Sequence, residues 1–361
     1  MNLNKLLEVK QYSLDRESKN ILLFEQLVEL HNHHMTHSKE YKSVCEKIFP
    51  SSLIQINDIG EIPFLPVSIF KNHELKSITD EQVLKVITSS GTTGSMPSKI
   101  FLDSETAQIQ TKALSKIISH IVGNSRRPML IIDSKSVLKD RTSFSARGAG
   151  ILGLSIFGSN HQYVLDDEFK LDSKVLETFL QKFEGQDILI FGFTFMIWQY
   201  FYQSSMEGKF DLSKATLIHS GGWKKLAELA VDNLTFKKAL HDKFNIKSEN
   251  IYNFYGMVEQ VGGVFLENSD GNMHCPNFCD IIIRNPYDFS IQPHGEEGLI
   301  QVLSSLPLSY PGHSLLTEDI GVCIGEDNAS NGWKGKHFKI LKRAKKAELR
   351  GCSDTFTSKS N

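Results

Sequence analysis

The sequence predicts an α/β fold built on a largely parallel sheet. Apolar, β-branched segments are predicted to form buried strands at 128–133, 187–191 and 214–219. Helical patterns alternate with these strands, at 173–182 and 227–244, and such alternation is typical of βαβ units. Ligands of open α/β sheets bind beyond the carboxyl ends of the strands, so the turn Ser220-Gly221-Gly222 is a candidate wall of a nucleotide site.

The N-terminal part of the chain is predicted to be helical from Ser18 to Ile48, with a second amphipathic stretch beginning at Lys39. His33 and His37 are spaced as i and i+4, which would suit a metal site, but no acidic residue or cysteine accompanies them and solvated histidines are the default interpretation. The two prolines in the segment 61–71 favour an extended conformation. A further helix is predicted from Ser104, as its N-cap, to Ile121.

A segment rich in hydroxyl groups, Thr88–Lys99, separates two predicted extended segments and reads Thr-Ser-Ser-Gly-Thr-Thr-Gly-Ser-Met-Pro-Ser-Lys. Gly91 and Gly94 permit close approach of the backbone, the hydroxyls donate hydrogen bonds, and Lys99 supplies positive charge. The spacing matches neither a Walker loop nor a Gly-x-Gly-x-x-Gly turn. By itself the segment is compatible with a polyphosphate loop and equally with a polar surface turn.

The composition is that of an ordinary globular protein. The 40 basic and 42 acidic side chains give a formal net charge of -2, which does not indicate a nucleic acid or an anionic membrane as partner. The most apolar run, 188–198, is too short and too interrupted to span a bilayer, and the start lacks the apolar core of a signal peptide. Five scattered cysteines are not a disulfide framework, so a cytoplasmic, reducing location is expected.

Two further motifs follow in the sequence, Tyr252-Asn-Phe-Tyr-Gly-Met-Val-Glu-Gln260 and Thr317-Glu-Asp-Ile-Gly321. Together with the loop Ser89-Ser-Gly-Thr-Thr-Gly94, and in this order, they resemble the adenylate-forming superfamily of acyl-CoA and aryl-CoA ligases. This resemblance implies the large N-terminal-type α/β domain of these enzymes, with mostly parallel sheets flanked by helices.

The chain is more closely similar to the acyl-protein synthetases of the LuxE family. The similarity is carried by His219-Ser-Gly-Gly-Trp-Lys224, by Ser309-Tyr-Pro311 and by a basic C-terminal segment that ends in Gly351-Cys352. It extends from about residue 40 to the C-terminus. The resemblance implies an ATP- and acyl-binding body over 1–330, and a short C-terminal segment, 331–361, in place of the full small domain of acyl-CoA ligases.

The resemblance also implies roles for individual residues. Glu259 would bind Mg²⁺ as a catalytic residue, because this ion prefers oxygen ligands, and Asp319 would accept both ribose hydroxyls. The β- and γ-phosphates would be held by Ser89, Ser90, Gly91, Thr92, Thr93, Gly94 and Lys99. The adenosine would contact Gly221, Gly222, Tyr255, Gly256 and Arg343, with Tyr255 stacked on adenine. Outside the motifs, such residues would be interpreted as surface charges or core aromatics.

The resemblance implies a ligase that uses ATP and Mg²⁺ to convert a carboxylic acid, in particular a fatty acid, into acyl-AMP. The acyl group would then pass to the thiol of Cys352, whose reactivity the preceding basic residues would increase by lowering its pKa. A reductase, an acyltransferase or an acyl carrier protein would be the partner. The alternatives are an acyl-CoA or acyl-carrier ligase of another pathway and a non-catalytic nucleotide-binding subunit.

Two points stay open in the sequence. Acyl-CoA ligases carry a catalytic lysine in the small domain that the short C-terminal segment is expected to replace here, and Lys342, Lys345 or Lys346 would take its place unless adenylation proceeds without one. The segment His274-Cys275-Pro-Asn-Phe-Cys279 resembles part of a zinc site but lacks a fourth ligand.

Overall fold

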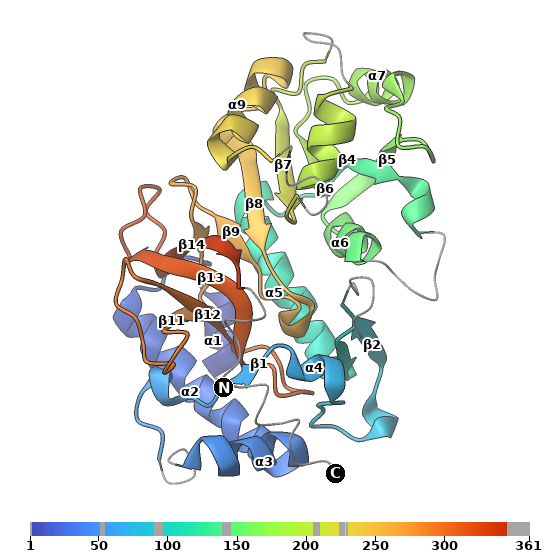
Figure 1. Cartoon of the computed structure of the whole chain (residues 1–361). Coiled ribbons are helices and arrows are strands. Elements are labelled where there is room, and N and C mark those ends of the chain that lie inside the picture. The colour runs from blue at the N-terminus through green and yellow to red at the C-terminus, as the bar shows by residue number, and fades with distance from the viewer. Residues whose placement is uncertain are drawn as a thin grey trace. The chain divides into compact units, whose positions relative to one another are not determined.

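The computed structural model describes residues 2–50, 55–89, 97–138, 146–204, 210–223, 228 and 230–344 (Figure 1). The chain forms two compact units. Unit 1 consists of Met1–Ile117 and Gly256–Asn361, and unit 2 of Ile118–Tyr255. Unit 2 is therefore an insertion between two parts of unit 1.

Unit 2 contains a parallel sheet with the strand order β5-β4-β6-β7-β8, and each neighbouring pair is parallel. Its strands are β4 (Arg127–Ser134), β5 (Gly158–Leu165), β6 (Ile188–Phe193), β7 (Ala215–Ser220) and β8 (Ile251–Tyr255). Its helices and helical turns are η4 (Lys135–Leu138), α6 (Ala146–Ser155), α7 (Ser173–Lys182), α8 (Thr194–Met196), η5 (Ile197–Tyr202), α9 (Asn233–Phe244) and η7 (Ser248–Asn250). The parallel sheet and its three predicted strands are confirmed.

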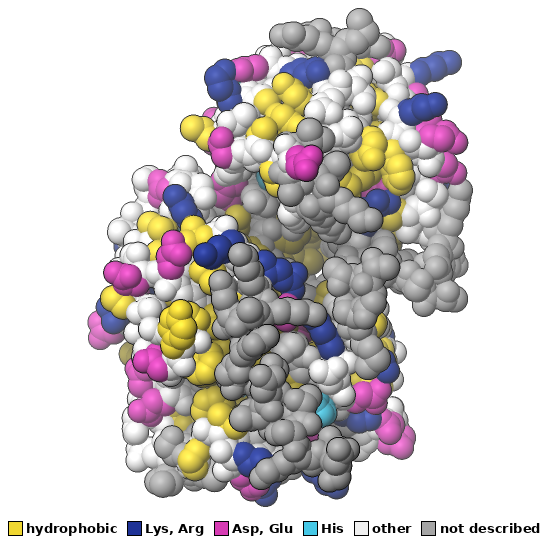
Figure 2. Space-filling view, viewed as in Figure 1, with side chains coloured by type: hydrophobic (Ala, Val, Ile, Leu, Met, Phe, Trp, Pro, Cys, Tyr) yellow, Lys and Arg dark blue, Asp and Glu magenta, His cyan; other side chains and the backbone are white. Residues whose placement is uncertain are grey.

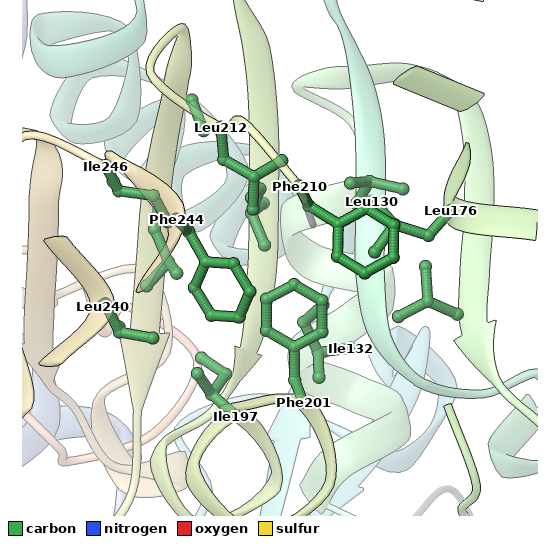
Figure 3. Close-up of a cluster of buried hydrophobic side chains, with 14 of the residues drawn as sticks. Leu130, Ile132, Leu176, Ile197, Phe201, Phe210, Leu212, Leu240, Phe244 and Ile246 are labelled. Carbon is green, nitrogen blue, oxygen red and sulfur yellow. The ribbon is translucent and has the colours of Figure 1, made fainter. Parts of the chain in front are cut away.

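The core of unit 2 is rich in phenylalanine. Phe201 and Phe244 stack with ring centroids 4.8 Å apart, and aliphatic side chains from the strands surround them (Figure 3). Helix α9 brings Phe244 and Leu240 to this core, and helix α7 brings Leu176. Burial of these large side chains stabilises the unit.

Unit 1 contains an antiparallel sheet with the strand order β11-β12-β13-β14-β10-β9, to which β1 adds in parallel with β13. The strands are β1 (Leu65–Pro66), β9 (Phe265–Glu267), β10 (Met273–His274), β11 (Cys279–Arg284), β12 (Glu297–Ser304), β13 (Ser314–Glu326) and β14 (Lys336–Arg343). The connections 285–296, 305–313 and 327–335 contain no crossover helix, and the strands that they join pair antiparallel.

The remaining elements of unit 1 are mostly helical. They are α1 (Asn2–Glu8), α2 (Arg16–His37), α3 (Lys39–Ile48), η2 (Ile59–Glu61), α4 (Ile69–Asn72), η3 (Asp80–Gln82), η8 (Val258–Gln260) and the first part of α5 (Ser104–Val122). The two strands β2 (Lys85–Thr88) and β3 (Lys99–Leu102) form a separate antiparallel hairpin. Among the described residues, no helix is long and apolar enough to cross a membrane.

Three local predictions need correction. Asp103, and not Ser104, caps helix α5, because its carboxylate accepts a hydrogen bond from the amide of Thr106 at 2.8 Å. Helix α9 begins at Asn233 and not at 227. The carboxylate of Asp232 accepts a hydrogen bond from the amide of Thr235 and so caps the N-terminal end of the helix. The segment 61–71 is extended over Leu65–Pro66 but forms helical turns at both of its ends.

The surface carries charges of both signs. On the face shown in Figure 2, basic and acidic side chains lie interspersed, with smaller hydrophobic patches between them. This distribution agrees with the net charge of -2 and does not form a continuous basic surface on that face.

Candidate active site

The predicted phosphate loop connects the two strands of the β2–β3 hairpin. Thr88 lies opposite Lys99 in the ladder, which confirms a loop between two extended segments. Beyond this pair, the amide of Ser89 donates to the carbonyl of Ser98 at 3.1 Å, and the hydroxyl of Ser89 accepts from the amide of Ser98 at 2.9 Å. Ser89 therefore closes the base of the loop. Ser90, Gly91, Thr92, Thr93 and Gly94 lie outside the described residues.

Lys99 projects from the first position of β3, and its side chain is half exposed. Its ammonium group lies 3.0 Å from a carboxylate oxygen of Glu74. An exposed pair of this kind is weak, so the ammonium group can exchange this partner for a phosphate at low cost. The role of Lys99 as a phosphate ligand remains a prediction.

Ser309 joins three segments of unit 1 next to the hairpin. Its buried hydroxyl donates to the carbonyl of Phe101 in β3 at 2.8 Å, and its amide donates to the hydroxyl of Thr106 in α5 at 3.1 Å. Its carbonyl accepts from the amide of Ser77 at 2.7 Å. Buried polar groups are costly unless they are paired, and here all three polar groups of one residue have partners. Ser309 thus fixes β3, the strand that follows the predicted phosphate loop.

Tyr310 connects the same segment to Glu259, the predicted magnesium ligand. The Tyr310 hydroxyl donates to the backbone carbonyl of Glu259 at 2.9 Å and accepts from the side-chain amide of Gln110 at 3.3 Å. The side-chain amide of Gln260 donates back to the carbonyl of Gly312 at 2.9 Å. Burial, and then the negative charge of Glu259, raises the pKa of Tyr310, so the hydroxyl stays protonated and donates.

Gly312 is required by the close approach of these two segments. A Cβ at this position would overlap the ring of Tyr310 and lie 3.0 Å from the carbonyl oxygen of Glu259. The carboxylate-bearing turn η8 therefore packs directly on the Ser309–Gly312 segment. Glu259 itself is largely buried, at 7% exposure.

Asp319, the predicted ribose ligand, lies in β13 opposite Arg343 of β14. Its amide donates to the hydroxyl of Thr317 at 3.1 Å, and this hydroxyl also donates to the carbonyl of Ile300 in β12. Arg343 is exposed and pairs with Glu318 at 2.6 Å. The Thr-x-Asp motif is thus a local structure in which the threonine fixes the backbone of the aspartate.

The predicted adenosine residues Gly221, Gly222 and Tyr255 lie in unit 2, and Gly256 is the first residue after it. Gly221 has a φ of +87°, which favours glycine, and a Cβ there would lie 3.1 Å from the ring of Phe193. Nothing lies within 4 Å of a Cβ at Gly222. Tyr255 ends strand β8. These positions agree with a site at the carboxyl ends of parallel strands.

His219 precedes this turn, and the sequence offered no role for it. Its Nδ1 lies 2.9 Å from the hydroxyl of Thr194, which lies 3.2 Å from the carbonyl of Ser220. Burial, together with the nearby charge of Lys237, lowers the pKa of His219 to about 3. A neutral imidazole therefore holds the end of β7 against α8 in unit 2.

The histidines considered as metal ligands have other partners, and Cys275 and Cys279 are buried, free thiols. His33 lies 3.1 Å from the carbonyl of Leu308, and both ring nitrogens of His274 lie near polar groups, of Asn268 at 3.2 Å and of Lys334 at 2.9 Å. In the part of the chain that the structure describes, no group of three or more His, Cys, Asp or Glu side chains is arranged to hold a metal ion.

Ser309-Tyr-Pro311 and His219 belong to segments that resemble the family, but the sequence indicates no function for them. A serine, tyrosine or histidine among apolar residues is the signal that could have marked these side chains as buried polar groups. The hydrogen-bond partner of such a group cannot be read from the sequence. Cys352, Lys345 and Lys346 lie outside the described residues.

The comparisons with known proteins address the family. The model of the family described as "Acyl-protein synthetase, LuxE" matches residues 3–360. The chain belongs to this family. It is 24% identical to a long-chain-fatty-acid–luciferin-component ligase of Vibrio harveyi, over 98% of this chain and 92% of that protein. It is also 24% identical to the protein of the same name from Aliivibrio fischeri, over 89% of this chain and 84% of that protein.

Solved structures show the same fold for this LuxE-family chain. A 2-hydroxyisobutyryl-CoA ligase in an open conformation, in complex with 2-HIB-AMP and CoA, superposes with a TM-score of 0.65. It shares 14% identity, over 92% of this chain and 76% of that one. The same ligase in its thioesterification state gives a TM-score of 0.66 at 15% identity, over 92% and 70% of the two chains. The predicted α/β fold of an adenylate-forming enzyme and the predicted class, an AMP-forming acid–thiol ligase, are confirmed.

Proposed function

We propose that this chain activates a long-chain fatty acid with ATP and transfers the acyl group, as a thioester, to its own Cys352. The observation that carries the proposal is the hydrogen-bonded connection, through Ser309 and Tyr310, between the strand after the phosphate loop and the turn that bears Glu259. It connects two of the three motifs through buried hydrogen bonds within unit 1, which supports a common role for them. The names of the luciferin-component ligases support a fatty acid as the substrate.

In the first step, a carboxylate oxygen of the fatty acid attacks the α-phosphorus of ATP. The bond from this phosphorus to the bridging oxygen breaks, and pyrophosphate leaves with the electron pair. The loop based on Ser89 and Lys99 would hold the leaving pyrophosphate, and Asp319 would hold the ribose. Because two anions must meet, these residues act by placement and by reducing charge repulsion.

The residues present fit a magnesium ion at Glu259. Its side chain is a carboxylate at a largely buried position, and carboxylate together with phosphate oxygens is the ligand set that Mg²⁺ prefers. When bound there, the ion would neutralise charge that develops on the pyrophosphate. Glu259 would hold it, and Tyr310 would hold the backbone of Glu259 through its carbonyl.

In the second step, a thiolate attacks the acyl carbon of acyl-AMP, the bond from carbon to the phosphate oxygen breaks, and AMP leaves. Four of the five cysteines are buried and free, namely Cys45, Cys275, Cys279 and Cys323. Burial raises the pKa of Cys45 and Cys323 to about 11 and that of Cys279 to about 12, and it raises that of Cys275 as well. Protonated, buried thiols are poor nucleophiles, which supports Cys352 as the acceptor.

Two assays test the proposal. Incubation of the wild-type chain with ATP, Mg²⁺, a long-chain fatty acid and hydroxylamine is expected to give the acyl hydroxamate, which reports acyl-AMP. Radiolabelled fatty acid is expected to stay on the denatured protein and to disappear in Cys352→Ser, whereas the matched variant Cys323→Ala keeps the label. A label that persists in Cys352→Ser contradicts the acceptor, and the absence of hydroxamate with every acid in a panel contradicts the activity.

The same assays distinguish the other acceptors. If Cys352→Ser releases acyl-CoA when coenzyme A is added, or acylates a carrier protein, the chain is a conventional ligase. A reductase is the proposed partner, since a thioester is the activated form from which an acyl group is reduced to an aldehyde. Transfer of label from the acylated chain to a reductase measures this step.

A further inference from the structure

A cavity of about 540 Å³ lies in unit 1, and the proposed adenylation chemistry does not use it. Its volume lies within the usual range for small-molecule sites. Apolar side chains from α3, β1, β13 and their neighbouring loops form much of its wall: Ile48, Phe49, Phe64, Pro66, Phe289 and Leu316. Phe64 and Leu316 belong to a hydrophobic cluster of unit 1, against which Phe49 and Phe289 pack. The cavity is therefore suited to an apolar chain.

A buried guanidinium group also lines the cavity. Arg284, at the end of β11, is 6% exposed and stacks on the ring of Phe64, with its Cζ 4.7 Å from the ring centroid. It donates to the side chain of Gln301 and to the carbonyls of Phe289 at 2.8 Å and Gly60 at 2.6 Å. A guanidinium has five N–H donors, so about two remain beyond these three bonds.

Among the described residues, the charge of Arg284 has no acidic partner. All three hydrogen-bond acceptors are neutral, and among the residues that the structure describes no carboxylate forms a salt bridge with this guanidinium. Burial lowers the pKa of Arg284 to about 10, which still leaves the group charged at neutral pH. An unpaired buried charge is unfavourable, and a carboxylate, which accepts paired N–H donors, is its natural complement.

We propose that this cavity binds a free long-chain fatty acid, with its carboxylate on Arg284 and its alkyl chain against Phe49, Phe64 and Leu316. Each methylene buried against these side chains would strengthen binding. The ligand class follows from the apolar part of the wall and from its one buried cation. Two carboxylates, of Glu61 and Asp288, also line the cavity, but both residues are exposed, and among the described residues neither forms a salt bridge with Arg284. A thioester is neutral and would not compensate the guanidinium, so the occupant is the free acid and not the acyl group on Cys352.

The cavity adjoins the start of the C-terminal segment. Ala344 packs against the same hydrophobic cluster, and its amide donates to the carbonyl of Glu318 at 2.8 Å. Cys352 follows eight residues later in the sequence. A fatty acid bound here would be held near the root of the segment that carries the proposed acceptor.

The test is photolabelling of the full chain, without ATP, by a long-chain fatty acid that carries a diazirine near its methyl end. Mass spectrometry of the digest is expected to find the label on peptides that contain 44–49 and 62–66. Ile48→Glu adds a negative charge at a cavity position that is 45% exposed and is expected to lower this labelling about tenfold. The matched variant Ile21→Glu, at a position that is 55% exposed on α2 and not part of the cavity, is expected to label as the wild type does.

Ligand variants test the role of the guanidinium. The unlabelled fatty acid is expected to compete with the probe at least about tenfold better than its methyl ester, and Arg284→Met is expected to abolish that difference. Labelling confined to other peptides, labelling that Ile48→Glu leaves unchanged, or equal competition by the methyl ester overturns the proposal. Hydroxamate formation by the same preparation separates the two proposals: hydroxamate without cavity labelling refutes this site alone, and cavity labelling without hydroxamate refutes the adenylation alone.

Discussion

In unit 2 the candidate residues Gly221 and Tyr255 lie where the parallel strands β7 and β8 end, whereas in unit 1 the turn that bears Glu259 is held by buried hydrogen bonds between distant segments. Ser309 reaches across 208 residues to Phe101, and Gln110 reaches across 200 residues to Tyr310. An apolar core therefore supports the residues of unit 2, together with the contact of His219 with Thr194, whereas buried hydrogen bonds between distant segments support the turn that bears Glu259 in unit 1. The two units should respond differently to acid and to loss of single side chains.

Acid is expected to destabilise unit 1 more than unit 2. In unit 1, burial lowers the pKa of His31 and His274 to about 4 and that of His313 to about 3, and it also lowers the pKa of His34. In unit 2, burial lowers the pKa of His219 to about 3. Each is neutral in both states above its unfolded pKa of about 6.5. Below that pH only the unfolded state takes up the proton, so stability falls as pH falls toward the folded pKa.

Between pH 7 and pH 5, each histidine whose folded pKa is about 3 or 4 is expected to remove ~2 kcal/mol of unfolding free energy. Native-state hydrogen exchange at both pH values, corrected for intrinsic rates, measures the opening of each unit. Equal losses of unfolding free energy in the two units would contradict the predicted difference between them.

Loss of one ring from the core of unit 2 is the next largest effect. Phe244→Ala empties a fully buried position in the stacked pair with Phe201 and is expected to cost about 3–5 kcal/mol of unfolding free energy. The matched variant Leu234→Ala, on the same helix at a position that is 79% exposed, is expected to change it by less than about 0.5 kcal/mol. Urea unfolding followed by circular dichroism measures both. A cost for Phe244→Ala no larger than that of its control contradicts the packing role.

Removal of one hydroxyl from the network of unit 1 has a smaller effect on stability but a specific effect on function. Tyr310→Phe leaves the carbonyl of Glu259 without this donor and is expected to cost about 1–3 kcal/mol. If the network positions Glu259, the variant also raises KM for MgATP or lowers kcat of hydroxamate formation about tenfold. Tyr287→Phe, at a position that is 93% exposed, is the control. If Tyr310→Phe lowers the unfolding free energy but leaves KM and kcat unchanged, the hydrogen-bond network has only a structural role.

Ser309→Ala refines the same point. Ser305, four residues earlier, is also buried, and its hydroxyl also donates to the carbonyl of a phenylalanine, Phe278, which lies outside the β2–β3 hairpin. Both alanine variants are expected to lose about 1 kcal/mol of stability, and Ser309→Ala alone is expected to weaken ATP use. Equal KM values for ATP and equal kcat values in the two variants would contradict a specific role for Ser309 in ATP use.

The smallest effect concerns the surface pair at the hairpin. Lys99→Ala and Glu74→Gln each break the same exposed ion pair and are expected to change stability by less than about 1 kcal/mol, and less at high salt. KM for ATP separates the two, since a phosphate ligand is lost in the lysine variant alone. Equal KM values for both variants contradict a phosphate role for Lys99.

Local patterns predicted the elements of unit 2 well, because helix α7 and the strands β4, β6 and β7 carry their signal in neighbouring residues. Helix α9 begins later than the apolar pattern predicts, because the capping hydrogen bond of Asp232 sets its N-terminal end. Glu259 and Asp319 are predicted as site residues because the motifs that contain them resemble those of adenylate-forming enzymes. The contact of Tyr310 with Glu259, across 51 residues, and the cavity beside Arg284 depend on tertiary packing, for which the sequence carries no local signal.

The exchange of radiolabelled pyrophosphate into ATP tests the central claim most directly, because it reports the reversible formation of acyl-AMP. The account predicts exchange that requires both Mg²⁺ and a long-chain fatty acid, that falls at least about a hundredfold in Glu259→Gln, and that persists in Glu297→Gln, an exposed glutamate of the same unit. Exchange that is independent of the fatty acid, or that Glu259→Gln leaves at the level of the wild type, would contradict it.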